Sequence, residues 1–161
     1  MADDQGLVAD IESDIVNKLT AISLGGNTVF RTVDNWRFQI VSADSFRAYS
    51  PFAFVEYDGT ARYDWEGNHD LGQRLVFTIR VGTEITQHNN GAARIGVGVD
   101  ASKYQLGISR LRDLVINALQ WQLAITSDAR TERYEYLGDD LVWSLPDQAA
   151  LMMRFQVDRV G

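Results

Sequence analysis

Two segments of the chain repeat their apolar residues every three or four positions. The first covers residues 5 to 23, with apolar residues at Leu7, Val8, Ile11, Ile15, Val16, Leu19 and Ile22. The second covers about 102 to 122, with apolar residues at Tyr104, Ile108, Leu111, Leu114, Val115, Ala118 and Leu119. This period gathers apolar side chains on one face of a helix. We therefore expect two amphipathic helices, the first ended by Gly25 and Gly26.

Strand patterns occupy much of the remaining chain. Residues 74 to 85 alternate most regularly, and residues 52 to 57, opened by Pro51, are apolar on both faces at their start, as in a central strand. These two segments predict a long antiparallel hairpin. Further strands are expected at 27 to 33, 60 to 65, 132 to 137, 141 to 143 and 150 to 157.

Three segments do not follow either period. Residues 34 to 50 predict a loop with a short strand or helical turn. Gly138, Asp139 and Asp140 predict a turn between two strands. Residues 86 to 100 contain several Gly and Asn residues and predict a long flexible loop, and loops of this length are usually functional or flexible.

The order of these elements predicts an α+β fold in a single domain spanning 1–161. The expected architecture is a mostly antiparallel sheet of four to six strands, with two amphipathic helices packed on one face. The opposite face of the sheet is then either solvated or buried by another subunit.

Composition narrows the classes of function. The chain has 15 basic and 22 acidic residues and a net charge of −7. An acidic protein does not hold a phosphate backbone non-specifically. Its charge either serves solubility or lines a channel through which DNA slides, because like charges repel. The acidic start and the lack of an apolar run of ~20 residues predict neither a secretory signal nor a membrane span, and therefore assembly in the cytoplasm.

Motifs that carry chemistry are weak in this chain. Residues 96 to 101 match G-x-G-x-x-A, but no further βαβ unit follows them, so a flexible loop explains them better than a dinucleotide site. His69 and His88 are polar residues in a turn and a loop, and the absence of cysteine excludes thiolate nucleophiles and cysteine-type zinc sites. Acidic residues also cluster at Glu132, Glu135, Asp139 and Asp140, in a spacing that fits no calcium loop. We therefore predict no catalytic residue, no cofactor and no metal ligand, and a protein that is not an enzyme.

Four tryptophans, Trp36, Trp65, Trp121 and Trp143, are many for a chain of 161 residues. Aromatic residues interleaved with basic ones can bind single-stranded nucleic acid, but the charge balance here is acidic. We therefore expect these residues in the core or at subunit interfaces, where tryptophan is enriched.

Several segments together resemble the tail-terminator (tail-completion) proteins of tailed bacteriophages, including the Mu-like prophage tail group. The resemblance covers most of the chain. It lies in the order of the elements and in the general pattern of residues within them. It includes the first helix ending near Gly25, the strand Pro51-Phe-Ala-Phe-Val-Glu-Tyr-Asp-Gly59 and the strand Leu75-Val-Phe-Thr-Ile-Arg-Val81. It continues with the helix Ser109-Arg-Leu-Arg-Asp-Leu-Val115 and with Tyr134-Glu-Tyr-Leu-Gly138 before a final alternating strand.

This resemblance implies a structural role in the tail or neck of a virion that is assembled in the host cytoplasm. Such proteins form a ring, typically a homohexamer, on the head-proximal end of the tail tube, where they stop tube growth and offer a joining surface to the head. The implied partners are further copies of the chain, the tail tube protein and a head-side connector protein, with DNA passing through the lumen without specific binding. The implied candidate contacts in the 86 to 100 loop are Gln87, His88, Asn89 and Arg94.

Other classes of function remain open at this point. One is another virion protein, such as a neck or head-completion protein or a minor tail component. Another is a small cytoplasmic ligand-binding domain or enzyme, which needs convergent polar groups in an apolar pocket. A third is a non-viral cytoplasmic adaptor.

Overall fold

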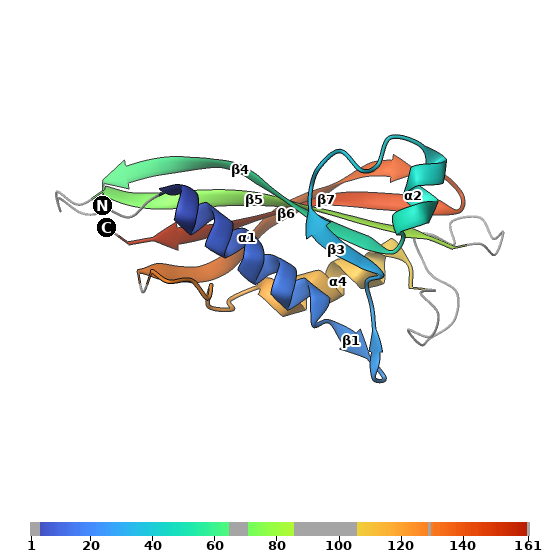
Figure 1. Cartoon of the computed structure of the whole chain (residues 1–161), viewed down its shortest axis with the longest axis horizontal. Coiled ribbons are helices and arrows are strands. Elements are labelled where there is room, and N and C mark those ends of the chain that lie inside the picture. Colours follow the sequence, from blue (N-terminus) through green and yellow to red (C-terminus); the bar gives the residue numbers. More distant parts are fainter. Residues whose placement is uncertain (1–3, 65–70, 86–105, 129, 161) are drawn as a thin grey trace.

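The computed structural model describes residues 4–64, 71–85, 106–128 and 130–160. Five strands form its main sheet: β3 (Thr32–Asn35), β4 (Phe52–Asp64), β5 (Leu71–Glu84), β6 (Thr131–Ser144) and β7 (Gln148–Arg159). Their order across the sheet is β3-β4-β5-β7-β6 (Figure 1). Strand β3 runs parallel to β4, and the other neighbouring pairs are antiparallel. The α+β class and the mostly antiparallel sheet predicted from the sequence are confirmed.

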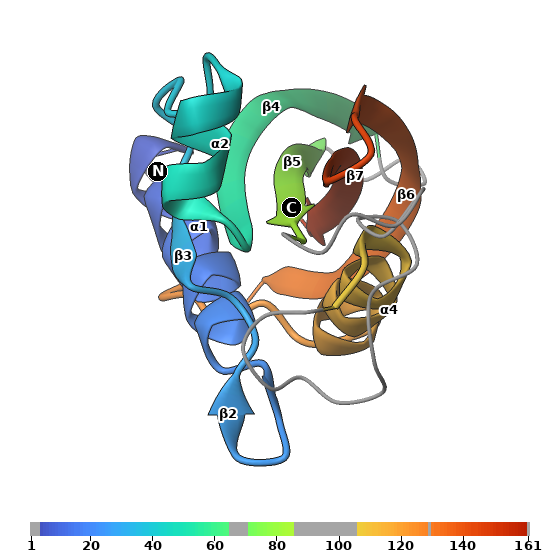
Figure 2. The same cartoon turned by 90° about the vertical axis from the view of Figure 1, so that its right-hand side faces the viewer.

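The first helix is α1 (Asp4–Thr20), and its apolar stripe is buried as the helical period predicts. The helix ends at Thr20, before the expected residue 23. Gly25 and Gly26 do not end it. They form the turn of a small antiparallel hairpin made by β1 (Ser23–Leu24) and β2 (Asn27–Thr28), which projects from the body of the molecule (Figures 1 and 2).

The segment from 34 to 50 contains the expected helical turn as a short helix, and strand β3 (Thr32–Asn35) extends only into its first two residues. Strand β3 pairs in parallel with the start of β4, at Thr32 opposite Phe52. A short helix, α2 (Ala43–Tyr49), follows a capping box in which the Ser42 side chain accepts from the Ser45 backbone and the Ser45 side chain accepts from the Ser42 backbone.

Strands β4 and β5 form the predicted long hairpin. Their register runs from Phe52 opposite Gly82 to Asp64 opposite Leu71. Asp58 and Gly59 do not interrupt β4, because the strand absorbs them in a β-bulge between Tyr57 and Gly59.

The predicted turn at Gly138, Asp139 and Asp140 is wrong. Strand β6 runs through these residues without a break, and its register to β7 shifts between Tyr136 and Gly138. Gly138 has a φ of +139°, which residues with a Cβ rarely adopt, so the residue that suggested a turn instead forms a bulge. The chain reverses after Ser144, where Leu145 N donates to Gln148 O at 2.7 Å.

The second predicted amphipathic helix is α4 (Ile108–Leu119), whose buried stripe is Ile108, Leu111, Val115 and Leu119. Residues 101–105, where this helix was expected to begin, lie outside the described residues. So do the predicted loop at 86 to 100 and the turn in which His69 is expected.

Helices α1 and α4 cover the same face of the curved sheet (Figure 2). Alternate residues of β4, β5 and β7 point into this main core, among them Val55, Ile79 and Phe155. The opposite face is partly covered by α2, whose Phe46 packs edge-on against Phe52 with ring centroids 5.0 Å apart. The prediction of two helices on one face is therefore confirmed, and a third helix occupies the other face.

Candidate functional site at the sheet edges

Exposed apolar side chains gather at the two edges of the main sheet. Among the described residues, nine large apolar side chains are at least 45% exposed. Seven of them lie on β6, just after it, or in the segment that follows α4, and we call them the β6 edge surface: Trp121, Leu123, Ile125, Leu137, Leu141, Val142 and Leu145. The other two, Phe38 and Val41, lie between β3 and α2. Since β3 and β6 are the outermost strands, the two groups lie at opposite edges.

The first half of β6 is covered by the segment after α4. Trp121 N donates to Tyr134 O at 2.9 Å, and Tyr134 N donates to Gln122 O at 2.9 Å. Beyond this short pairing, the side chain of Gln120 accepts from Tyr136 N at 2.6 Å. This local cover ends near Tyr136.

The second half of β6 is an open edge. Between residues 137 and 144, no described segment pairs with the side of β6 that faces away from β7. Leu141 and Val142 on this stretch are 48% and 50% exposed. An unpaired strand edge offers backbone donors and acceptors to another chain, and proteins usually protect such edges with charges or cover. Here the edge carries Asp139 and Asp140, but also the exposed apolar side chains of Leu137, Leu141 and Val142. Exposed apolar side chains that gather along a strand edge are typical of an interface.

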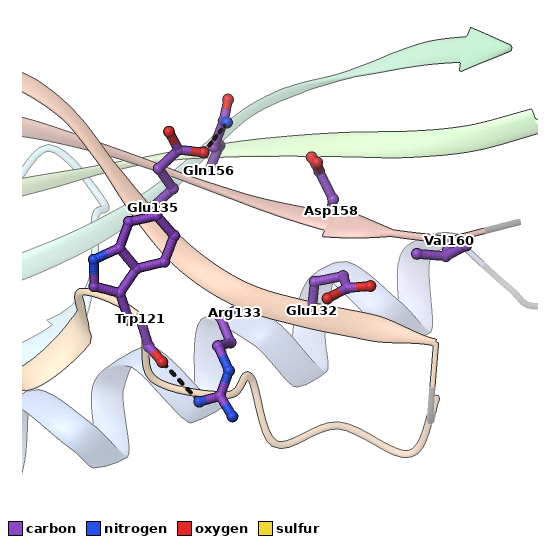
Figure 3. A pocket seen from close by; sticks show the side chains of 7 residues that line it. All are labelled: Trp121, Glu132, Arg133, Glu135, Gln156, Asp158 and Val160. Carbon is purple, nitrogen blue, oxygen red and sulfur yellow. Dashed lines mark hydrogen bonds between the residues drawn. The ribbon is translucent and has the colours of Figure 1, made fainter. Parts of the chain in front are cut away.

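A hollow of about 290 Å³ lies beside the covered half of β6 (Figure 3). It is lined by Trp121, Glu132, Arg133, Glu135, Gln156, Asp158 and Val160. Trp121 has a φ of +62°, a left-handed conformation that is unusual for a bulky residue. Arg133 holds it there by donating from Nη1 to the Trp121 carbonyl oxygen at 2.8 Å.

The carboxylates of this hollow differ in how well they are neutralised. Asp158 accepts two hydrogen bonds from the Arg74 guanidinium, at 2.9 and 3.1 Å. Glu135 accepts only a neutral hydrogen bond among the described residues, from Gln156 Nε2 at 2.7 Å. Glu132 is exposed, and its carboxylate has no hydrogen-bond or ion-pair partner among the described residues. The hollow therefore combines an aromatic ring with three carboxylates and one basic residue, Arg133, so its lining is acidic on balance.

The opposite edge carries an exposed corner at residues 37–41, which we call the β3 corner. Phe38 is 74% exposed and has a φ of +61°. The backbone around it is held by hydrogen bonds: Arg37 N donates to Gln39 Oε1 at 2.6 Å, and Gln39 Nε2 donates to Asn35 O at 2.8 Å. Trp36 connects the corner to the sheet. Its ring lies 5.8 Å from the ring of Phe54 and 4.5 Å from the Arg80 guanidinium.

The part of the sheet beyond α2 displays balanced charges. Arg80 pairs with Glu56 at 2.7 Å, Arg74 with Asp158 at 2.9 Å, and Arg154 with Asp140 at 3.1 Å. Of the two outcomes predicted for this face, solvation or burial by a subunit, these paired charges favour solvation. The exposed apolar residues lie at the edges instead.

A second hollow, of about 490 Å³, lies between α1 and the segment 125–127. Its acidic groups are engaged: Asp14 pairs with Lys18 at 2.6 Å, and Asp10 accepts from Ser127 Oγ at 2.8 Å. Among the described residues, no group of three or more His, Asp or Glu is placed to hold a metal ion. Within that same part of the chain, no helix has the length and apolarity needed to cross a membrane.

The predicted contacts Gln87, His88, Asn89 and Arg94 all lie outside the described residues. The carboxylates that cluster in the sequence are separated by their partners. Asp139 accepts from Arg112 Nε at 2.6 Å and from the Tyr136 hydroxyl, and Asp140 accepts from Arg154. The hydrogen bond to Asp139 raises the pKa of Arg112 further above its usual range, so the Arg112 side of this pair stays charged.

Of the described tryptophans, Trp36 and Trp143 pack against the buried cluster of Phe46, Phe52, Phe54 and Ala150, as expected for core residues. Trp121 is 59% exposed, and its place at a subunit interface stays a prediction. The β6 edge surface is not visible in the sequence. The apolar run at residues 141–143 predicts a short strand, but no local pattern shows that this strand lies at the edge of the sheet.

No known protein family matches this chain, and no curated protein matches it. Among solved structures, the chain is similar to one from the virion of a native gene transfer agent particle. The two share 16% sequence identity with a TM-score of 0.54, over 96% of this chain and 97% of that chain. The two proteins therefore share a fold along nearly their whole lengths.

Proposed function

We propose that the protein is a structural subunit of a phage-like virion. The observation that carries this proposal is that exposed apolar residues gather at both edges of the sheet, along β6 and just beyond β3, on opposite sides of one chain. In an isolated protein, such edges promote aggregation, because they pair with other chains. In an assembly, the same edges form the contacts between subunits. The fold shared with a chain of the gene transfer agent virion supports the same role.

Within the virion, we propose that the protein is the tail terminator. It forms a ring on the head-proximal end of the tail tube, ends tube growth and provides the surface to which the head joins. The sequence resemblance to tail-completion proteins supports this assignment. So does the placement of the apolar groups, because edges on opposite sides of a subunit join head to tail, and head-to-tail contacts close into a ring when the rotation between subunits permits.

The charge of the chain suits a ring through which DNA passes. The net charge of −7 disfavours lasting contacts with phosphates, so DNA moves through the lumen without being held. The proposed partners are further copies of the chain, the tail tube protein and a head-side connector. The mechanism is one of surface complementarity and needs no turnover.

The nearest competing assignment is another neck or head-completion protein, which the shared fold supports equally. The two assignments differ in the neighbour that the ring binds. A terminator binds the end of the tail tube and limits its length, whereas a head-completion protein binds the head-side connector and leaves tube length unchanged.

The first test is the native mass of the full chain, followed by negative-stain imaging of any large species. We expect a closed ring of about six copies with a central hole. The ring is then added to polymerising tail tube protein, where it is expected to cap one end and shorten the tubes. A strict monomer, with and without tubes, contradicts the proposal. A ring that ignores tubes but binds the connector favours the competing assignment.

A matched pair of variants ties the ring to the sheet edge. Leu141→Asp places a charge on the open half of β6 and is expected to abolish ring formation. Ala9→Asp places the same charge on an exposed position of α1 and is expected to leave the ring intact. Both positions are solvent-accessible, so both variants should fold, which circular dichroism checks.

A further inference from the structure

Two aromatic residues of the described chain share an unusual combination of properties. Phe38 and Trp121 are the non-glycine residues at positive φ among the described residues, at +61° and +62°. They are also strongly exposed, at 74% and 59%. A bulky side chain in the left-handed region is strained, and an exposed aromatic ring gains nothing from burial. Strain of this kind persists at sites where it serves binding.

Both residues are held in place by the surrounding structure. The backbone groups of Trp121 are engaged, with N donating to Tyr134 O at 2.9 Å and O accepting from Arg133 at 2.8 Å. Phe38 lies between Trp36, whose N donates to Val55 O at 2.8 Å, and Gln39, whose side chain bonds the backbone of both Asn35 and Arg37. The backbone of each residue is therefore held before any partner arrives, which lowers the entropy lost on binding.

The surroundings of the two rings have opposite charge. Beside Trp121, the Glu132 carboxylate has no partner among the described residues, and the Glu135 carboxylate accepts only from the neutral Gln156. The one basic residue of the hollow, Arg133, donates to the Trp121 carbonyl oxygen, so carboxylates predominate there. Beside Phe38 lies Arg37, which is 70% exposed and has a loose 3.6 Å contact with Asp34. A guanidinium from another chain can bind both the Trp121 ring and the carboxylates of the hollow, because it stacks on an indole ring and donates to carboxylates.

The positions of the two sites determine which molecule brings them together. Phe38 lies at the β3 edge and Trp121 at the β6 edge, with β4, β5 and β7 between them, so one copy does not join its own two sites. A second copy of the chain supplies the missing half, and its own free edge then receives a third.

We infer that the β3 corner of one copy, with Arg37 and Phe38, docks into the Trp121 hollow of the next copy. This inference rests on the proposed ring and identifies one of the contacts that join neighbouring copies, beside the half of β6 that Leu141 does not occupy. Arg37 meets Glu132 and Glu135, and the two aromatic rings bury each other beside this charge cluster. The contact is heterologous, and its repetition joins successive copies in one direction.

The chain contains no cysteine, so introduced cysteines are the only thiols available for crosslinking, and a crosslinking test is direct. The full chain carrying both Phe38→Cys and Trp121→Cys is treated with a short bismaleimide and run on a denaturing gel. A head-to-tail contact yields a ladder of trimers and higher species, whereas each single variant yields no species beyond dimers. Phe38→Cys combined with Ala9→Cys is the matched control and is expected to give no ladder.

A charge exchange tests the electrostatic half of the contact. Arg37→Glu and Glu132→Arg are each expected to weaken ring formation at least tenfold, and a chain with both changes is expected to recover most of that loss. Arg110→Glu, at an exposed arginine of α4, is the control for a changed net charge. Sedimentation over a concentration series measures the association.

A third variant separates this role from a structural one. Trp121→Gly removes the indole ring and also the strain, because glycine adopts a positive φ freely. The variant is therefore expected to have an unchanged or raised melting temperature and a weaker association. A fall in melting temperature with association unchanged would show that Trp121 serves the monomer and would overturn the inference.

The outcomes distinguish this inference from the proposed function. If rings form, Leu141→Asp abolishes them, and the cysteine pair gives no ladder, then the corner-to-hollow contact is wrong and the ring stands. If the unmodified chain forms no ring with or without tail tubes and the cysteine pair gives no ladder, both are wrong.

Discussion

The Tyr134 hydroxyl donates a 2.7 Å hydrogen bond to Asp14 Oδ2 and so joins β6 to α1 across 120 positions of sequence. Tyr134 is fully buried and Asp14 is 6% exposed. The carboxylate also accepts from Lys18 Nζ at 2.6 and 2.7 Å, which offsets the cost of burying its charge. The first helix is thereby fixed relative to the edge strand that we propose to carry the subunit contact.

Replacing Tyr134 with Phe tests this connection. The change keeps the ring and removes the hydroxyl, so the Asp14 carboxylate loses a buried donor, and we expect the free energy of unfolding to fall by about 1–3 kcal/mol. Urea denaturation measures it. Tyr49→Phe is the control, because Tyr49 has no hydrogen bond from its hydroxyl among the described residues, and it is expected to change stability by less than about 0.5 kcal/mol. Equal losses in both variants would contradict the assigned role of the hydrogen bond.

The same hydroxyl predicts a loss of stability in alkali. Burial, reinforced by the hydrogen bond to Asp14, raises the pKa of Tyr134 well above its usual range. The folded state therefore holds the phenolic proton more tightly than the unfolded state, whose tyrosine titrates near pH ~10. The contribution of the protonated Tyr134 to the free energy of unfolding is fully present below that pH and declines as the pH rises above it. Unfolding measured at a series of pH values above neutral is expected to show a weaker decline in Tyr134→Phe than in the unmodified chain.

Because of Asp128, we expect the stability of the protein to fall in acid. Hydrogen bonds from the Arg130 side chain, then from the Arg130 backbone and from Arg159 at 2.8 Å, hold the pKa of Asp128 well below its usual range. Its contribution is present above the unfolded value near pH ~4 and is lost as the pH falls below it. Because Arg130 is half-exposed, we expect the contribution to be about 1 kcal/mol or less. Asp128→Asn should remove this part of the acid sensitivity, and an unchanged acid profile would refute the assignment.

Gly82 leaves room for an aromatic ring. A Cβ at this position would lie 2.2 Å from Cζ of Phe52, which is 2% exposed and cannot swing into solvent. Gly82→Ala is therefore expected to cost about 1–3 kcal/mol through overpacking. Thermal and urea unfolding measure the loss. Phe52→Leu in the same chain should recover part of it, and strictly additive losses would argue against the proposed clash.

Local patterns account for the elements that the sequence predicted well. The helical period placed Ile11 and Ile15 on the buried stripe of α1, and alternation placed Leu75 to Val81 in a strand that is buried on one face. These patterns depend on residues close in sequence, which is why they are visible without a structure. The antiparallel hairpin of β4 and β5 followed because its strands are neighbours in the chain.

Elements that depend on distant partners were predicted less well. The parallel pairing of β3 with β4 joins segments on either side of α2, and no local pattern announces it. Gly138 was assigned to a turn because glycine favours turns and bulges alike, and its pairing with β7 decides between them.

The sequence by itself determined which residues are apolar, where α1, α4 and the β4–β5 hairpin form, and that the chain is acidic and lacks cysteine. Only the tertiary structure decided that β6 and β3 are the edge strands, and therefore that Leu141, Trp121 and Phe38 are exposed. The physical reason is that burial depends on what lies on each side of a strand. An apolar residue such as Leu141 has the same local pattern in the centre of a sheet as at its edge, and the order of the strands alone leaves it free for a second subunit.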